Sequence, residues 1–145
     1  MAEGAGPVEG TSPATASTKH GAGRALITVY AILAVGASAR SIYELVVKFD
    51  QAPLAYGLSA VAAVVYCVIP DALVKDTPGW RRVAFVCMVA ELVGVLVVGT
   101  LSVVDPAAFD AKSSVWFWYG RDYLFIPLVL PILGLNFLRR TRAAR

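Results

Sequence analysis

Between Val83 and Val104 the chain runs for 22 residues with a single charged side chain, Glu91. A helix of that length can cross the hydrocarbon core of a bilayer, which is about 30 Å thick. An ionised carboxylate near the centre of a membrane costs several kcal/mol unless it is paired, neutralised or facing a polar cavity. Glu91 is therefore the residue whose surroundings most constrain the fold and the function.

Four apolar segments predict four membrane-spanning helices, at about residues 25–47, 53–74, 83–104 and 121–138. These segments are continuously apolar, whereas the strands of a membrane β-barrel alternate with a period of two. Apolar residues make up 58% of the sequence, more than the roughly 45–50% of soluble domains. The predicted fold is an all-α membrane protein, a four-transmembrane-helix bundle formed by residues 24–140.

The two ends of the chain are predicted to be tails. Residues 1–23, rich in Ala, Gly, Ser, Thr and Pro, are typical of a disordered segment, and residues 141–145 form a short basic tail. An alternative is that the first apolar segment is a signal peptide cleaved after Ala39, which would leave three spans. Against cleavage, apolar residues resume directly after Ala39, as in a continuing helix.

The basic residues predict the orientation of the bundle. If the N-terminus is cytoplasmic, nine of the 13 Lys and Arg residues lie on the cytoplasmic side: Lys19, Arg24, Lys75, Arg81, Arg82, Arg139, Arg140, Arg142 and Arg145. Because cytoplasmic loops carry the excess of positive charge, we expect a multi-pass plasma-membrane protein with both termini in the cytoplasm. On the outer side, the aromatic residues of the 105–122 loop and Tyr123 are typical of an interfacial belt, with a binding lip as the alternative.

Two interpretations of Glu91 follow from its position. Burial disfavours the ionised form of a carboxyl, so we expect a neutral acid unless a cation lies nearby. It is either a proton or cation relay, or a structural acid that hydrogen-bonds a neighbouring helix through Tyr56, Ser59, Tyr66 or Asn136. Ala90 and Gly94, four residues apart, predict close packing beside it, so Glu91 is expected to point into the bundle or toward a partner.

Arg40 and Glu44 form the second candidate site. Their i, i+4 spacing places both on one face of the first helix, where they can neutralise each other. They lie toward the outer end of that span, which predicts an interfacial ion pair with long side chains reaching the membrane surface. An anionic ligand on Arg40 is the alternative.

The sequence predicts no catalytic site, metal or cofactor. It has no glycine-rich phosphate loop, serine elbow or acidic cluster. His20 is the only histidine, which excludes haem ligation by paired histidines and a His-based zinc site within one chain. The arginines after the fourth span are explained by anionic lipid headgroups, so no nucleic acid is expected as a partner.

The order of the segments resembles a known type of protein. Residues 49–54 open the second span, Glu91-Leu92-Val93-Gly94 lies in the third, and Pro127-Leu128-Val129-Leu130-Pro131 lies in the fourth. This pattern resembles the small uncharacterised four-span integral membrane proteins of actinobacteria over about residues 24–140. That resemblance implies no activity. The small multidrug-resistance transporters differ, because they carry their essential Glu in the first span.

We therefore expect a membrane protein without a catalytic site, acting as an accessory or scaffolding component of a membrane assembly. Its expected partners are membrane lipids and either further copies of itself or a larger membrane protein. The alternative is a small oligomeric proton-coupled transporter or channel that uses Glu91.

Overall fold

The computed structural model describes residues 21–107 and 114–143. Within these ranges the chain forms only helices: α1 (Ala22–Val47), η1 (Phe49–Gln51), α2 (Pro53–Lys75), α3 (Pro78–Val104), η2 (Phe117–Tyr123) and α4 (Ile126–Ala143), where η marks short 3-10 helices. The fold is an all-α four-helix bundle, as predicted from the sequence. Of the predicted tail over residues 1–23, residues 1–20, with Lys19, lie outside the described residues, as does Arg145 at the other end. Residues 22 and 23 already belong to α1 and are not part of a tail.

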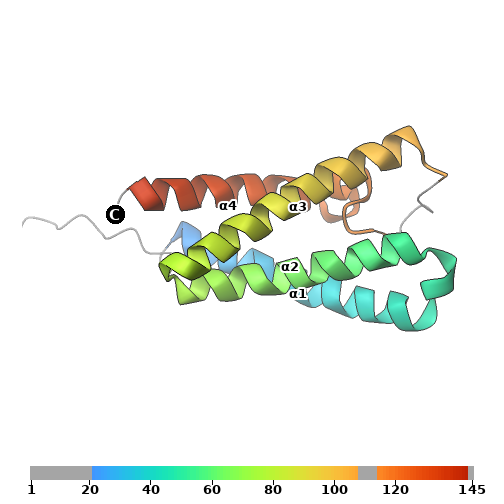
Figure 1. Cartoon of the computed structure of the whole chain (residues 1–145), viewed down its shortest axis with the longest axis horizontal. Helices are drawn as coiled ribbons and strands as arrows, with labels where there is room; N and C mark the ends of the chain where they lie inside the picture. The colour runs from blue at the N-terminus through green and yellow to red at the C-terminus, as the bar shows by residue number, and fades with distance from the viewer. Residues whose placement is uncertain (1–20, 108–113, 144–145) are drawn as a thin grey trace, which may run out of the picture.

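The four long helices run up and down in chain order (Figure 1). α1 and α2 form a long antiparallel hairpin, α3 crosses it at a slant, and α4 returns beside the first part of α3. We call the end that holds the start of α1, the α2–α3 turn and the end of α4 the basic end. It carries Arg24, Lys75, Arg81, Arg82, Arg139, Arg140 and Arg142. The opposite end, with η1 and η2, is the loop end.

The turn between α2 and α3 explains why α3 begins before its apolar run. Asp76 adopts a left-handed conformation with φ 48° and ends α2. The Thr77 side chain then accepts a hydrogen bond from the backbone N–H of Trp80, and Pro78 occupies the first helical position. Both are standard start signals for a helix. α3 therefore begins at Pro78, five residues before Val83, and its first turns carry Arg81 and Arg82.

The fourth span differs from the predicted segment 121–138. α4 covers Ile126–Ala143, so residues 141–143 are helical rather than a tail. η2 precedes it at an angle of 95°, and Leu124 and Phe125 between them have φ of 55° and 58°. Residues in the left-handed conformation interrupt a right-handed helix. Hydropathy does not depend on that conformation, so it predicts the span but not its bend.

The described helices are suited to a membrane. α1, α2 and α3 are each long and apolar enough to cross it, and a fourth crossing is obtained if η2 and α4 count as one broken span. Large apolar side chains face outward along the helices, including Val46, which is 79% exposed. Contiguous apolar surface of this extent is unusual for a soluble monomer. The chain is therefore a multi-pass membrane protein.

Candidate functional site

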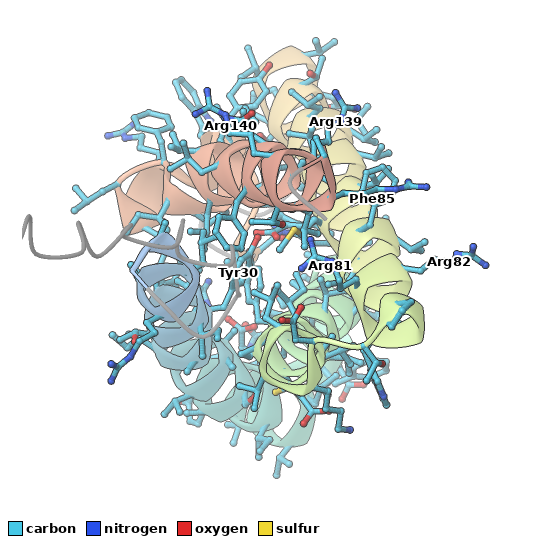
Figure 2. The ribbon with its side chains drawn as sticks, turned by 90° about the vertical axis from the view of Figure 1, so that its left-hand side faces the viewer. Tyr30, Arg81, Arg82, Phe85, Arg139 and Arg140 are labelled. Atoms are coloured by element: carbon cyan, nitrogen blue, oxygen red, sulfur yellow. The ribbon has the colours of Figure 1, made fainter. Side chains whose placement is uncertain are left out.

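Glu91 lies in the middle of α3 with no solvent exposure (0%). The Tyr30 hydroxyl, from α1, donates a hydrogen bond of 2.9 Å to its Oε2 atom. Tyr30 is itself fully buried, and Figure 2 shows it pointing into the middle of the bundle. The carboxyl therefore points inward, as expected, and its hydrogen bond joins α3 to α1.

Two more buried aromatic residues extend this contact into a network. The Tyr66 side chain, from α2, lies against the same carboxyl and interacts with it. Its hydroxyl oxygen accepts a hydrogen bond of 3.1 Å from Trp116 Nε1, and the Tyr30 and Tyr66 rings lie 6.3 Å apart, centroid to centroid. We call Tyr30, Tyr66, Glu91 and Trp116 the Glu91 network. It connects α1, α2, α3 and the segment that leads into η2.

The chemistry of this network is that of a neutral acid. Among the described residues no Lys or Arg forms an ion pair with Glu91. Its second oxygen, Oε1, has no hydrogen-bond partner within the part of the chain that the structure describes. A buried charge without a cation is strongly unfavourable, whereas a buried carboxylic acid requires only hydrogen bonds. The surroundings therefore favour the uncharged form of Glu91.

The predicted partners of Glu91 are only partly found beside it. Tyr66 is one of them, but Asn136 is exposed on α4. α4 instead turns Pro127, Leu130, Pro131, Gly134 and Leu138 inward. Tyr30 was missed because it lies 61 residues from Glu91 in the sequence. The polar hydroxyl of an aromatic residue in the first span was the available signal, since a buried tyrosine normally finds a hydrogen-bond partner.

Trp116 corrects the prediction of a purely interfacial aromatic belt. It is only 3% exposed, and its ring packs so closely on Gly94 that a Cβ atom there would lie 2.6 Å from the ring atom Cζ3. The Tyr119 ring packs in the same way against Gly99. Among the described aromatic residues from 114 to 123, Trp118 alone is classed as exposed, at 40%, as expected of a belt residue. Gly94 and Gly99 leave room on α3 for these two rings.

The second candidate site forms a compact cluster near the loop end. Arg40 Nε donates to Glu44 Oε1 at 2.7 Å, and a second guanidinium nitrogen of Arg40 donates to the Tyr123 hydroxyl at 3.1 Å. The Glu44 side chain is buried and that of Arg40 is partly buried. The pair thus also connects α1 to the end of η2, a contact that the i, i+4 spacing alone does not reveal.

Comparisons with protein-family models, curated proteins and solved structures find no match for this chain. The described residues also contain no group of three or more His, Cys, Asp or Glu side chains that could hold a metal ion.

Proposed function

We propose that this protein is a non-catalytic accessory or scaffolding component of a membrane assembly. The observation that carries the proposal is the burial of Glu91 among side chains of its own chain, Tyr30 and Tyr66. A carboxyl that serves transport has to meet an ion or a proton from outside. A carboxyl enclosed by tyrosines instead ties helices together, and buried polar networks of this kind make a bundle rigid and specific.

The charge distribution supports a plasma-membrane protein with both termini in the cytoplasm. Seven described Lys and Arg residues lie at the basic end. The loop end has three in the described part of the chain, namely Arg40, Lys48 and Arg121. The side of the membrane that faces the cytoplasm normally carries this excess. We therefore assign the basic end to the cytoplasm.

The outer surface of the bundle supports a partner in the membrane. Apolar side chains on α1 and α3, such as Ile32, Val35 and Val97, are half or more exposed. Such surfaces contact lipid chains or the helices of another membrane protein. A rigid bundle with apolar faces suits a component that positions a larger membrane protein.

The experiment that tests this proposal is purification of the full chain from its native membranes in mild detergent, followed by mass determination of the intact complex. A stoichiometric larger membrane protein in the complex is the expected result. Recovery of the chain as a monomer, or only with copies of itself, would contradict the accessory role.

A second candidate is a small oligomeric proton-coupled transporter or channel that uses Glu91. The unpartnered Oε1 atom of Glu91 favours it, because that oxygen is available to bind or release a proton. In proteoliposomes with a trapped pH dye, this candidate predicts proton flux that Glu91→Gln abolishes, since an amide cannot exchange that proton. Absence of flux, or equal flux in the variant, would exclude it.

A further inference from the structure

A cleft of about 640 Å³ opens at the basic end, between the start of α3 and the end of α4. Figure 2 looks at this end and shows Arg82, Phe85 and Arg139 on the side where α3 and α4 meet. The cleft is lined by Pro78, Arg81, Arg82, Phe85, Val86, Leu138, Arg139 and Arg142. Its volume falls in the range of small-molecule sites, roughly 300–1,000 Å³.

Arg81 lines the inner part of the cleft and already forms three hydrogen bonds within the chain. It donates to Asp76 Oδ1 at 2.9 Å, to the backbone carbonyl of Leu138 at 3.2 Å and to the Thr141 hydroxyl. The first contact neutralises its charge, and the other two fix the end of α4 against the start of α3. These contacts connect the two helices that form the cleft. Figure 2 shows Arg81 pointing inward between them.

The other three arginines of the cleft differ from Arg81 in their exposure and in their hydrogen bonding. Arg82, Arg139 and Arg142 are exposed, and none of them forms a hydrogen bond or ion pair with the residues described. Three guanidinium groups around one cleft, without acidic partners, create a local positive potential that attracts an anion. Guanidinium groups bind phosphate oxygens in pairs and with charge-assisted hydrogen bonds.

The remaining walls of the cleft are apolar. Phe85 and Val86 are exposed, and the apolar surface continues along α3 through Val89 and Val93. A ligand with a phosphate at the arginines and a hydrocarbon chain along α3 would contact both the basic and the apolar part of the cleft. A free phosphate would leave the apolar wall unused.

We propose that this cleft binds the headgroup of an anionic phospholipid, with its phosphate held by Arg82, Arg139 and Arg142 and its acyl chains along α3. Basic pockets between membrane helices at the headgroup level bind such lipids. Because three arginine charges are uncompensated, a headgroup with two phosphates fits better than one with a single phosphate. This site is independent of the accessory role.

The test is native mass spectrometry of the full chain in mild detergent, titrated with cardiolipin, phosphatidylglycerol, phosphatidylcholine or glycerol phosphate. The expected affinity falls in that order, with retained lipid adducts for the first two. The double variant Arg82→Gln/Arg139→Gln should raise the Kd for cardiolipin by about 25-fold, because each arginine in contact with the headgroup phosphates contributes about fivefold.

The matched control is Arg24→Gln/Arg140→Gln, which removes two charges from the same end without touching the cleft lining. Its Kd should stay within about twofold of the unchanged protein. An equal loss in both double variants would overturn the proposal, because it would indicate diffuse attraction to the whole end. Glycerol phosphate binding as tightly as lipid would overturn the lipid assignment. If the cleft variant does not fold, Arg142→Gln alone provides the test, with an expected loss of about fivefold.

Discussion

The ionisable side chains in the middle of the bundle and at its basic end have different surroundings. In the middle, Glu91 is completely buried and its hydrogen-bond partner, Tyr30, comes from another helix of the same chain. At the basic end, Arg82, Arg139 and Arg142 are exposed and no described residue pairs with them. Glu91 is enclosed by side chains of its own chain, whereas the three arginines are free to contact water or lipid headgroups.

This difference follows from the solvent at each depth. In the hydrocarbon core an unmatched polar group costs free energy, so the fold has to supply its partner. At the headgroup level water and lipid phosphates are available, and an unpaired arginine there gains from both. The inner polar groups of this bundle therefore determine how its helices pack, and the outer ones determine what it contacts.

The largest expected effect comes from emptying the inner site. Glu91→Ala removes the acceptor of the Tyr30 hydrogen bond and leaves a cavity in the core. We expect a loss of about 3 kcal/mol in the free energy of unfolding, combining the cavity and the unpaired hydroxyl. Unfolding of the purified protein in mixed detergent micelles, followed by tryptophan fluorescence, measures it.

The matched control at the same position is Glu91→Gln. An amide has nearly the volume of a neutral carboxylic acid and can still accept from Tyr30, so the loss should stay below about 1 kcal/mol. If Gln proves as destabilising as Ala, an ionised Glu91 is required and the comparison between an uncharged interior and a charged end fails.

The sequence predicted the helices well and their contacts poorly. The apolar runs located all four long helices because hydrophobic length alone decides which segments can span a membrane. Ionisable residues such as Lys48, Asp76 and Asp105 follow the ends of α1, α2 and α3 directly. The bend before α4 was missed because it depends on the backbone of Leu124 and Phe125, which are ordinary apolar residues in composition.

Glu91 and one of its neighbours, Tyr66, were singled out from the sequence, but Tyr30 and Trp116 were not. A lone carboxylate in an apolar run is visible in the sequence, whereas the choice of Tyr30 depends on how α1 is rotated about its own axis. α1 is apolar nearly all round, so no periodic pattern reveals that rotation. Trp116 was assigned to the surface because aromatic residues outside a span usually lie there. Its burial requires the space beside Gly94, a property of packing.

The packing of Trp116 on Gly94 provides a second test of the interior, with a smaller expected effect on stability. Gly94→Ala would place a methyl group against the Trp116 ring, and this ring, whose Nε1 donates to Tyr66, has to move to admit it. We expect a loss of about 1–3 kcal/mol in the free energy of unfolding, the usual cost of overpacking a core.

Gly36→Ala in α1 is the matched control, because nothing lies within 4 Å of its added Cβ. It should be neutral or slightly stabilising, since alanine favours helices. Equal losses for both glycines would show that the Trp116 contact does not hold the network in place.

The smallest expected effect on stability belongs to the outer arginines. Arg82→Gln/Arg139→Gln should change the free energy of unfolding by less than about 0.5 kcal/mol per site, because neither side chain has a partner within the described part of the bundle. The same mixed-micelle unfolding measures it, with phosphatidylcholine as the only lipid so that anionic lipid does not contribute. A loss of more than about 2 kcal/mol would mean that these arginines hold α3 and α4 together, as Arg81 does. The arginines at the basic end would then stabilise the fold, as Glu91 does. The two regions would differ only in their depth in the membrane.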